Sequence, residues 1–279
     1  MTEITRMSWT PPADWSAAYD NRAAVGQAEV EAFIADITAK ASAFRTELTT
    51  TKRARVDQAY GDRPRQRFDL FLPDASPTSL AIFIHGGYWR SFDKSFWSHL
   101  AAGPLARNAV VAIPSYTLCP EARIRDISKE IGQFLEKVAA AFPLPIHLSG
   151  HSAGGHLATT SDALDRLPDQ RVVKVVSISG VHDLRPLLKT SMNQDLHLDA
   201  DEALEESPVL QDPPPNIDLT CWVGADELPS FRQQNRLLAD IWGGLGARTE
   251  AVEAAGKHHF SVVEDLAAPE SDLVRTLMS

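Results

Sequence analysis

The sequence lacks several features that mark specialised classes of protein. It has only two cysteines, Cys119 and Cys221, and their spacing is not that of a short metal-binding pair. No apolar run reaches the roughly 18 residues that a membrane span needs, and residues 1–15 contain no apolar core of an export signal. We therefore expect a cytoplasmic protein whose cysteines are buried free thiols, as is usual in a reducing compartment.

Long runs of like charge are absent as well. The chain carries 27 basic and 37 acidic residues, a net charge of −10, and this balance excludes nucleic acid and anionic membranes as obvious partners. With 279 residues, of which 44% are apolar and 23% charged, the chain can bury a large core without disulfides or metals. We expect one domain over residues 1–279, with a small molecule as its partner.

The first quarter of the chain shows two patterns. Residues 1–50 are expected to form a polar, irregular segment followed by a helix, because apolar residues between Val30 and Phe44 recur at the spacing of one helix face. In residues 55–60 and 67–72, polar residues alternate with apolar ones on either side of a Gly-Asp-Arg-Pro turn. This alternation predicts two edge strands of a half-exposed sheet.

Short continuous apolar runs follow, separated by longer amphipathic stretches. Buried parallel strands have this composition, and the apolar residues between Ile124 and Val138 recur on one helix face. The predicted strands are residues 80–84, 109–113, 146–148, 172–178 and 219–223. The alternation predicts an α/β fold with a mainly parallel central sheet flanked by helices. Residues 181–216 break it and predict a small insertion near the carboxyl edge of the sheet, over the active site.

A nucleophile motif lies between a predicted strand and a predicted helix. Residues 150–154 read Gly-His-Ser-Ala-Gly, after the strand 145–149 and before a helix that runs through Ala158. A sharp strand-to-helix turn needs a glycine on both sides, because a Cβ there would collide with neighbouring backbone. Such a turn exposes the serine hydroxyl at the helix N-terminus. In this context the motif predicts an α/β-hydrolase fold with Ser152 as the nucleophile.

A second motif, His-Gly-Gly-Tyr-Trp at residues 85–89, directly follows another predicted strand. Acyl transfer places negative charge on the carbonyl oxygen of the substrate, and backbone N–H groups aimed at that oxygen stabilise it. Glycines let the backbone approach the oxygen closely. We expect the oxyanion hole to be formed by Gly87, Tyr88 and Ala153, the last of which follows the nucleophile.

In this class the acid and the histidine come after the serine in the chain. Residues 221–227 end a predicted strand in a turn with two adjacent carboxylates, Asp226 and Glu227, and these residues alone do not decide which one faces the histidine. Two histidines, His258 and His259, follow a predicted strand near the C-terminus. We take His259 as the general base, which accepts the serine proton and delivers it to the leaving group while the acid orients the ring.

Several segments together resemble the kynurenine formamidase (arylformamidase) branch of the α/β-hydrolases, and the resemblance runs from about residue 15 to the end. They are the loop 85–89 with Asp93 and Lys94, residues 116–121, residues 178–184, and then Asn193, Leu196, Ser207 and Pro208. In that family the acid follows a glycine by three residues, as Glu227 follows Gly224. The family histidine immediately precedes a phenylalanine, as His259 does. The resemblance therefore implies Glu227 as the acid, although aspartate is commoner there, and His259 as the base.

The resemblance implies an enzyme that cleaves a formamide C–N bond, such as that of the aryl formamide N-formylkynurenine. The reaction would pass through a Ser-acid-His triad and a formyl-enzyme, and it requires no metal or organic cofactor because a base-activated serine supplies the nucleophile. Tyr88 and Trp89 are the candidates for an aromatic, substrate-binding wall. The family also suggests a homodimer.

Three other functions remain open at this point. An amidase that acts on another formamide in heterocycle breakdown, or a carboxylesterase that acts on small acyl esters, would use the same residues. A non-catalytic ligand-binding protein on the same scaffold is disfavoured, because such a protein is expected to have lost a triad residue and this chain has candidates for all three.

Overall fold

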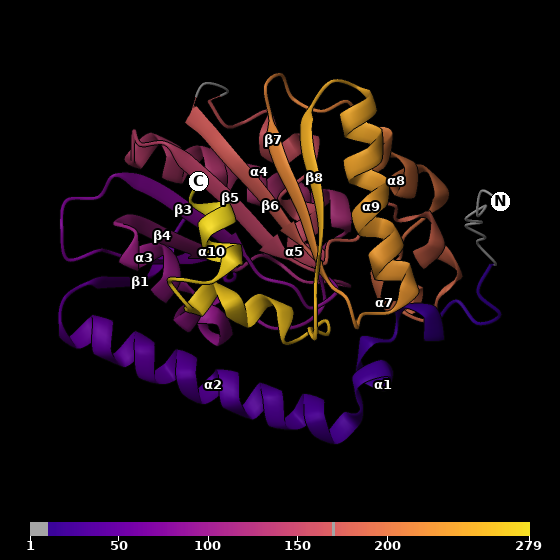
Figure 1. Cartoon of the computed structure of the whole chain (residues 1–279), viewed down its shortest axis with the longest axis horizontal. Helices are drawn as coiled ribbons and strands as arrows, with labels where there is room; N and C mark the ends of the chain where they lie inside the picture. Colours follow the sequence, from indigo (N-terminus) through magenta and orange to yellow (C-terminus); the bar gives the residue numbers. More distant parts are fainter. Residues whose placement is uncertain (1–10, 169–170) are drawn as a thin grey trace, which may run out of the picture.

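A computed structural model gives the fold of residues 11–168 and 171–279. One eight-stranded sheet has the order β1-β2-β4-β3-β5-β6-β7-β8, with helices on both of its faces (Figure 1). The strands are β1 (Ala54–Ala59), β2 (Arg67–Phe71), β3 (Ser79–Ile84), β4 (Ala109–Pro114), β5 (Ile146–His151), β6 (Val172–Ile178), β7 (Asp218–Gly224) and β8 (Arg248–Ala254). Only the pairs β1–β2 and β2–β4 are antiparallel. The fold is therefore the mainly parallel α/β sheet that the sequence predicts.

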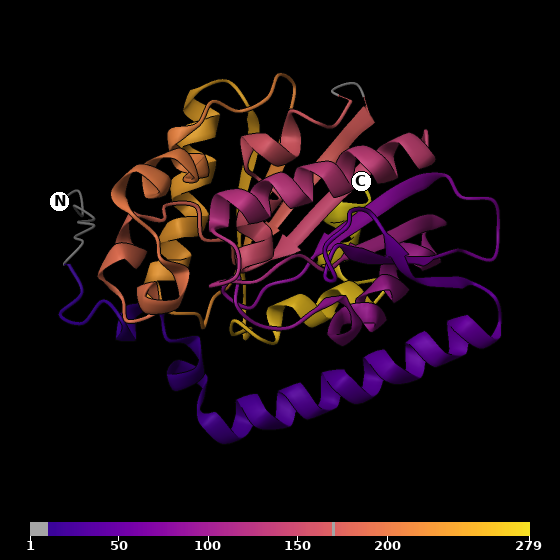
Figure 2. The ribbon, with the colours of Figure 1, turned by 180° about the vertical axis from the view of Figure 1, so that it is seen from behind.

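α-Helices and 3-10 helices (η) connect the strands and cover the sheet. In chain order they are η1 (Ala17–Tyr19), α1 (Asn21–Val25), α2 (Gln27–Thr50), η2 (Lys94–Ala101), α3 (Ala102–Ala106), α4 (Ile124–Ala141), α5 (Ala153–Leu157), α6 (Ser161–Leu164), η4 (Arg185–Lys189), α7 (Asn193–Leu196), α8 (Ala200–Glu205), η5 (Pro208–Leu210), α9 (Pro229–Gly244), η6 (Val262–Ala267) and α10 (Asp272–Leu277). In Figure 1 α10 lies in front of the sheet, and in the reverse view of Figure 2 α4 does. The sheet is thus the middle layer of three.

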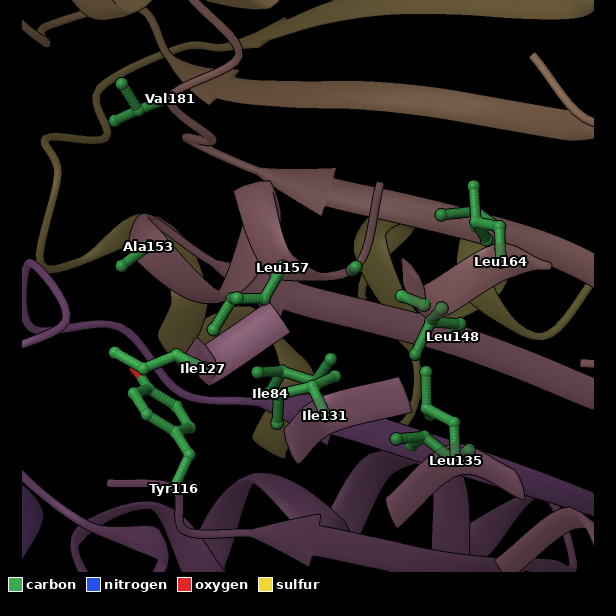
Figure 3. Packing of buried hydrophobic residues seen from close by; sticks show 14 of the residues in the cluster. Ile84, Tyr116, Ile127, Ile131, Leu135, Leu148, Ala153, Leu157, Leu164 and Val181 are labelled. Carbon is green, nitrogen blue, oxygen red and sulfur yellow. The ribbon is translucent and has the colours of Figure 1, made fainter. Parts of the chain in front are cut away.

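The central strands contribute side chains to two separate hydrophobic cores, because successive side chains of a strand point to opposite faces of the sheet. In β3, Leu80 and Ile82 belong to the core that includes α4 and α9, whereas Ala81 and Phe83 belong to the core that includes α2, α3 and α10. Both faces are apolar, which is why these strands appear in the sequence as continuous apolar runs. Figure 3 shows part of the first core, where side chains of α4 pack over those of β3 and β5.

The predicted amphipathic helix is α4. Ile127, Ile131 and Leu135 are fully buried and recur at the spacing of one helix face, as Figure 3 shows. The helix begins after Arg123, whose backbone N–H donates to the carboxylate of Asp126 at 3.3 Å. A carboxylate at this position also interacts favourably with the positive end of the helix dipole.

One prediction for the first strands is wrong. β1 is an edge strand, but β2 lies between β1 and β4, and four of its five residues are buried. The polar residue that suggested exposure, Asp69, is fully buried and accepts from the Arg45 guanidinium at 2.9 Å, with the Lys94 ammonium 3.3 Å away. A buried, paired carboxylate and an exposed one occupy the same place in an alternating sequence pattern, so the pattern could not separate them.

The segment before α2 also differs from the expectation of an irregular chain. Residues 17–19 form η1 and residues 21–25 form α1, whose first turn is capped by Asp20 through a 3.0 Å bond from the N–H of Ala23. Tyr19 and Asn21 are buried. Residues 1–10 lie outside the described part of the chain.

The expected long helix is α2, which runs along one side of the molecule in both views (Figures 1 and 2). Both cysteines are buried free thiols, as predicted. Among residues 11–168 and 171–279, no helix has the length and apolar character that crossing a membrane requires.

Candidate active site

Ser152 lies in the sharp turn between β5 and α5. Its backbone has φ 56° and ψ −118°, a conformation that L-residues rarely adopt, and its N–H donates to the carbonyl of Ile178 at 2.8 Å. A Cβ on Gly150 would run into the carbonyl oxygen of Gly154, and a Cβ on Gly154 would run into that of Ile84. The predicted need for glycine on both sides of the serine is therefore confirmed.

His259 follows β8 and is held by Glu227, which follows β7. The Nδ1 atom of His259 is 2.7 Å from Oε2 of Glu227. Oε1 of the same carboxylate accepts from the Ser179 hydroxyl at 2.5 Å and from the backbone N–H of Gly224 at 2.8 Å. Since a carboxylate only accepts, Nδ1 carries the proton and Nε2 is left as the basic nitrogen. This is the tautomer that a general base in a Ser-acid-His triad requires.

The two adjacent carboxylates point in different directions, as the turn requires. The Glu227 side chain has no exposed surface, whereas Asp226 is exposed and its backbone N–H donates to the carbonyl of Lys257 at 3.0 Å. The side chains of His258 and His259 also point in different directions. The ring of His258 points towards α2, where its Nε2 lies 3.3 Å from the Glu29 carboxylate. Glu227 is thus the carboxylate bonded to His259, which lines the same cavity as Ser152, and Asp226 is not.

The ring of His259 is packed on two sides. The ring of Phe231 from α9 is 4.6 Å away and that of His151 is 4.8 Å away, centroid to centroid. Nε2 of His151 donates to the backbone carbonyl of His259 at 2.9 Å. The hydroxyl of Ser152 forms no hydrogen bond with another described residue. In unliganded hydrolases the bond from serine to histidine often tightens only when substrate is bound.

The loop after β3 lies beside the nucleophile. Among the described residues, the backbone N–H groups of Gly87, Tyr88 and Ala153 have no acceptor. Gly87 and Tyr88 both have positive φ, 116° and 51°, which turns the loop sharply. The Arg65 guanidinium fixes the end of the loop by donating to the carbonyl of Phe92 at 2.5 Å. Backbone N–H groups without an acceptor are available to stabilise an oxyanion.

The two aromatic residues of this loop have different positions. Tyr88 lines the cavity at Ser152, and its phenol donates to the carbonyl of Tyr19 at 2.6 Å. Burial raises the pKa of the Tyr88 phenol well above its usual value, so it remains a donor. Trp89 is fully buried in the core against the ring of His156, 5.1 Å away, and does not line the cavity. Trp89, which we expected beside the substrate, is thus not part of the wall of this cavity, because the loop turns its ring inwards.

The cavity at Ser152, which we call the Ser152 cavity, has a volume of about 280 Å³. It is lined by Ser16, Tyr19, Asp20, Asn21, Arg22, Phe33, Ile34, Gly87, Tyr88, Arg90, Ser91, Phe92, Trp97, His151, Ser152, Ser191, Met192, His259 and Phe260. Six of these side chains are Phe, Tyr or Trp, which gives the cavity flat apolar surfaces. Ser191 and Met192 belong to the segment 181–216.

Sequence reasoning missed the N-terminal side of this cavity, formed by Ser16 and Tyr19–Arg22, which we call the N-terminal wall. No motif marks these residues, and the segment appears polar and irregular in the sequence. It also missed Ser179, the hydroxyl donor to Glu227. Ser179 directly follows a predicted strand, the place where functional residues gather in parallel sheets, and this position was the one available signal.

Three other histidines belong to the segments that carry the two motifs or directly follow them, and burial keeps them neutral. Loss of contact with water lowers the pKa of His85 and of His156 to about 4 and holds that of His151 well below its usual value. His156 donates to the carbonyl of Glu206 at 2.6 Å. These rings act as uncharged structural groups at neutral pH. In residues 11–168 and 171–279, no group of three His, Cys, Asp or Glu side chains is placed to hold a metal ion.

Four segments that follow parallel strands therefore meet at the carboxyl edge of the sheet: the loop after β3, the turn after β5, the turn after β7 and the segment after β8. This arrangement of fold and site defines an α/β-hydrolase. The model of the BD-FAE family matches residues 68–213, which is 146 of 279 residues. The chain belongs to the BD-FAE family.

The curated relatives agree with the resemblance seen in the sequence. The kynurenine formamidase of Danio rerio is 28% identical and is aligned over 82% of this chain and 84% of its own length. The kynurenine formamidase of Drosophila melanogaster is 29% identical, with 83% of each chain covered. The crystal structure of a Silicibacter sp. TM1040 protein named as a candidate thioesterase is 44% identical, has a TM-score of 0.88, and covers 95% of this chain and 98% of its own. The predicted similarity to the kynurenine formamidase branch is confirmed, and these relatives are named as hydrolases.

Proposed function

We propose that this protein hydrolyses a formamide C–N bond, and that its substrate is an aryl formamide such as N-formylkynurenine. One observation carries the proposal: Ser152 and His259, the latter bonded to Glu227, line a cavity that six Phe, Tyr or Trp side chains also line. A formyl group is the smallest acyl group, so most of a volume of about 280 Å³ is left for a planar leaving group.

The proposed reaction uses only side chains and backbone of this chain. Ser152 Oγ attacks the formyl carbon while Nε2 of His259 takes the hydroxyl proton, and the N–H groups of Gly87, Tyr88 and Ala153 receive the oxyanion. The C–N bond then breaks, and His259 returns the proton to the departing amine. Water, deprotonated by the same histidine, attacks the formyl-enzyme and releases formate and free Ser152.

Glu227 has two tasks in this scheme. It holds the tautomer of His259 in which Nε2 is basic, and it stabilises the imidazolium formed when that nitrogen takes the proton. The bonds from Ser179 and Gly224 fix the position of its carboxylate.

The experiment is a comparison of acyl groups with the purified protein. N-formylkynurenine, a simple aryl formamide, p-nitrophenyl acetate and a small acyl thioester are measured side by side, and we expect the largest kcat/KM for an aryl formamide. Faster cleavage of the acetate or the thioester would favour an esterase or a thioesterase instead. The 44% identical Silicibacter sp. TM1040 protein makes the thioester a necessary arm of the experiment.

The control for this comparison is Ser152→Ala, which we expect to lower kcat on the preferred substrate by roughly 10⁴- to 10⁶-fold with the fold retained by circular dichroism. Wild-type rates in this variant would contradict the mechanism for every substrate. Covalent labelling of the wild-type protein by a fluorophosphonate, absent in Ser152→Ala, would exclude a non-catalytic binding protein.

A further inference from the structure

The N-terminal wall is fixed in place by the core of the enzyme. The carbonyl of Tyr19 accepts from the phenol of Tyr88 at 2.6 Å, and the hydroxyl of Tyr19 accepts from the side-chain amide of Gln234 in α9 at 3.1 Å. The ring of Tyr19 also packs edge-on against Phe231, 5.9 Å away. Phe231 in turn packs on His259. The N-terminal wall is therefore in contact with the loop after β3, through Tyr88, and with His259, through Phe231. Its side chains therefore have defined positions relative to Ser152.

Asn21 is one of the residues that line the Ser152 cavity, and its side-chain amide has no partner among the described residues. The residue is only 4% exposed, its Nδ2 is sealed from water, and it forms no side-chain hydrogen bond with any described residue. Leaving a buried amide unpaired costs stability, and proteins avoid it except where another molecule supplies the partner. Because Asn21 lies in the wall of the cavity that holds Ser152, the bound substrate can supply that partner.

Arg22, the next residue, brings an unpaired positive charge to the same cavity. Of the two arginines in its walls, Arg90 forms an ion pair with Asp195, whereas Arg22 has no acidic partner among the described residues. The acid next to it, Asp20, accepts from the N–H of Ala23 as the cap of α1. A guanidinium and a side-chain amide in the wall of one cavity are suited to a carboxylate, which accepts several hydrogen bonds and carries the opposite charge.

We propose that Asn21 and Arg22 form a specificity-determining subsite that binds a carboxylate group of the substrate. This proposal rests on the proposed function, because formamide cleavage fixes where the carboxylate lies on the substrate. A formyl group has no substituent, so the carboxylate must belong to the leaving amine. The charge of Arg22 attracts the carboxylate into a protein that is otherwise strongly acidic, and the Asn21 amide donates to it. The subsite thereby selects which formamide reaches Ser152.

The test uses two substrates with the same scissile bond, an aryl formamide that carries a carboxylate and the same compound without it. For the wild type we expect a higher kcat/KM on the carboxylated compound. Asn21→Ala and Arg22→Gln should each raise KM for that compound by roughly tenfold to a hundredfold, with kcat much less affected. On the compound without a carboxylate, both variants should stay within about twofold of the wild type.

Three further variants separate recognition from general effects. Arg22→Lys keeps the charge and should recover most of the affinity. Asn21→Asp keeps the size of the side chain but adds a negative charge, so it should reverse the preference between the two substrates. Arg107→Gln removes one positive charge far from the cavity, where Arg107 pairs with Glu270, and should leave both KM values unchanged.

The outcomes that overturn the proposal are specific. If Asn21→Ala and Asn21→Asp lower kcat/KM equally on both substrates, Asn21 and Arg22 have a structural role and not a role in recognition. A wild type without preference for the carboxylate would also exclude the subsite, while formamide cleavage itself would stand. If neither formamide is cleaved, the proposed function has failed, and the same variants on a matched pair of aryl esters, with and without a carboxylate, then decide the subsite alone.

Discussion

The Ser152 cavity has two sides that are built differently. The side that we propose to be catalytic, formed by Ser152, Glu227 and His259, lies on segments that follow parallel strands and is held by buried bonds, three of them to one carboxylate. We call it the catalytic side. The N-terminal wall is held through the backbone and ring of Tyr19, while Asn21 and Arg22 keep their polar groups unpaired.

The difference shows how one cavity can separate chemistry from selection. Groups that must stabilise charge as the reaction proceeds are useful only if they are oriented beforehand, so the protein itself satisfies the carboxylate that orients His259. Groups that recognise a substrate need free hydrogen-bonding capacity, and the protein leaves it free at some cost in stability. Changes on the catalytic side should therefore reduce kcat on every substrate, and changes in the N-terminal wall should act on some substrates only.

The largest effect is expected at the buried acid. Glu227→Gln should lower kcat on the order of 10³- to 10⁴-fold, because a neutral amide can neither hold the reactive tautomer of His259 nor stabilise its charged form. Asp226→Asn, one residue away and exposed, should change kcat by less than about twofold. Steady-state kinetics of both variants measure the difference, and equal losses would show that the two carboxylates are misassigned.

Acid should destabilise the catalytic side through its neutral histidines. The pKa of His85 and of His156 is about 4 in the folded chain against an ordinary value near 6.5, so the unfolded chain binds more protons between these values. Stability is complete above about pH 6.5 and falls as the pH drops towards 4, by up to about 1.4 kcal/mol per pH unit for each histidine. Urea unfolding at pH 7, 6 and 5 measures this slope.

A matched pair of variants isolates one histidine from the rest. His156→Gln removes a buried titrating group and should reduce the slope by about 1.4 kcal/mol per pH unit. His197 is exposed with φ 52°, a conformation that asparagine also tolerates, so His197→Asn should leave the slope unchanged. The same slope in wild type and His156→Gln would mean that His156 is not kept neutral by burial.

The smallest effect is expected at the contact between the two sides. Tyr88→Phe removes the hydrogen bond to the carbonyl of Tyr19 and should lower the free energy of unfolding by about 1 kcal/mol. Because the N-terminal wall loosens, KM for a carboxylated formamide should rise several-fold. Tyr60→Phe is the control, since its phenol donates to the carbonyl of Ser115 at 2.7 Å away from the cavity. Tyr60→Phe should lose similar stability with no change in KM. The same KM in Tyr88→Phe and Tyr60→Phe would show that the N-terminal wall does not contribute to substrate recognition.

How far the sequence reaches depends on whether a feature is local. The turn at Ser152 could be predicted because glycine, serine and glycine at fixed spacing between a strand and a helix satisfy a steric demand that the chain carries within five residues. The long helices α2 and α4 could be predicted from apolar periodicity for the same reason. The position of the Trp89 ring could not be predicted from the sequence. It depends on the positive φ values of its loop, and the end of that loop is held by Arg65, a residue that precedes β2.

By itself the sequence determined the α/β class, a single candidate nucleophile, and a shortlist for acid and base. Tertiary structure decided between Asp226 and Glu227, since adjacent side chains in a turn diverge and only packing against His259 and Ser179 selects one. It also buried Asp69 with its cationic partners and brought Asn21 and Arg22 to a serine about 130 positions away in the chain. A sequence records which side chains can bury, bond or carry charge, but the partner that satisfies each one is found only when distant segments pack together.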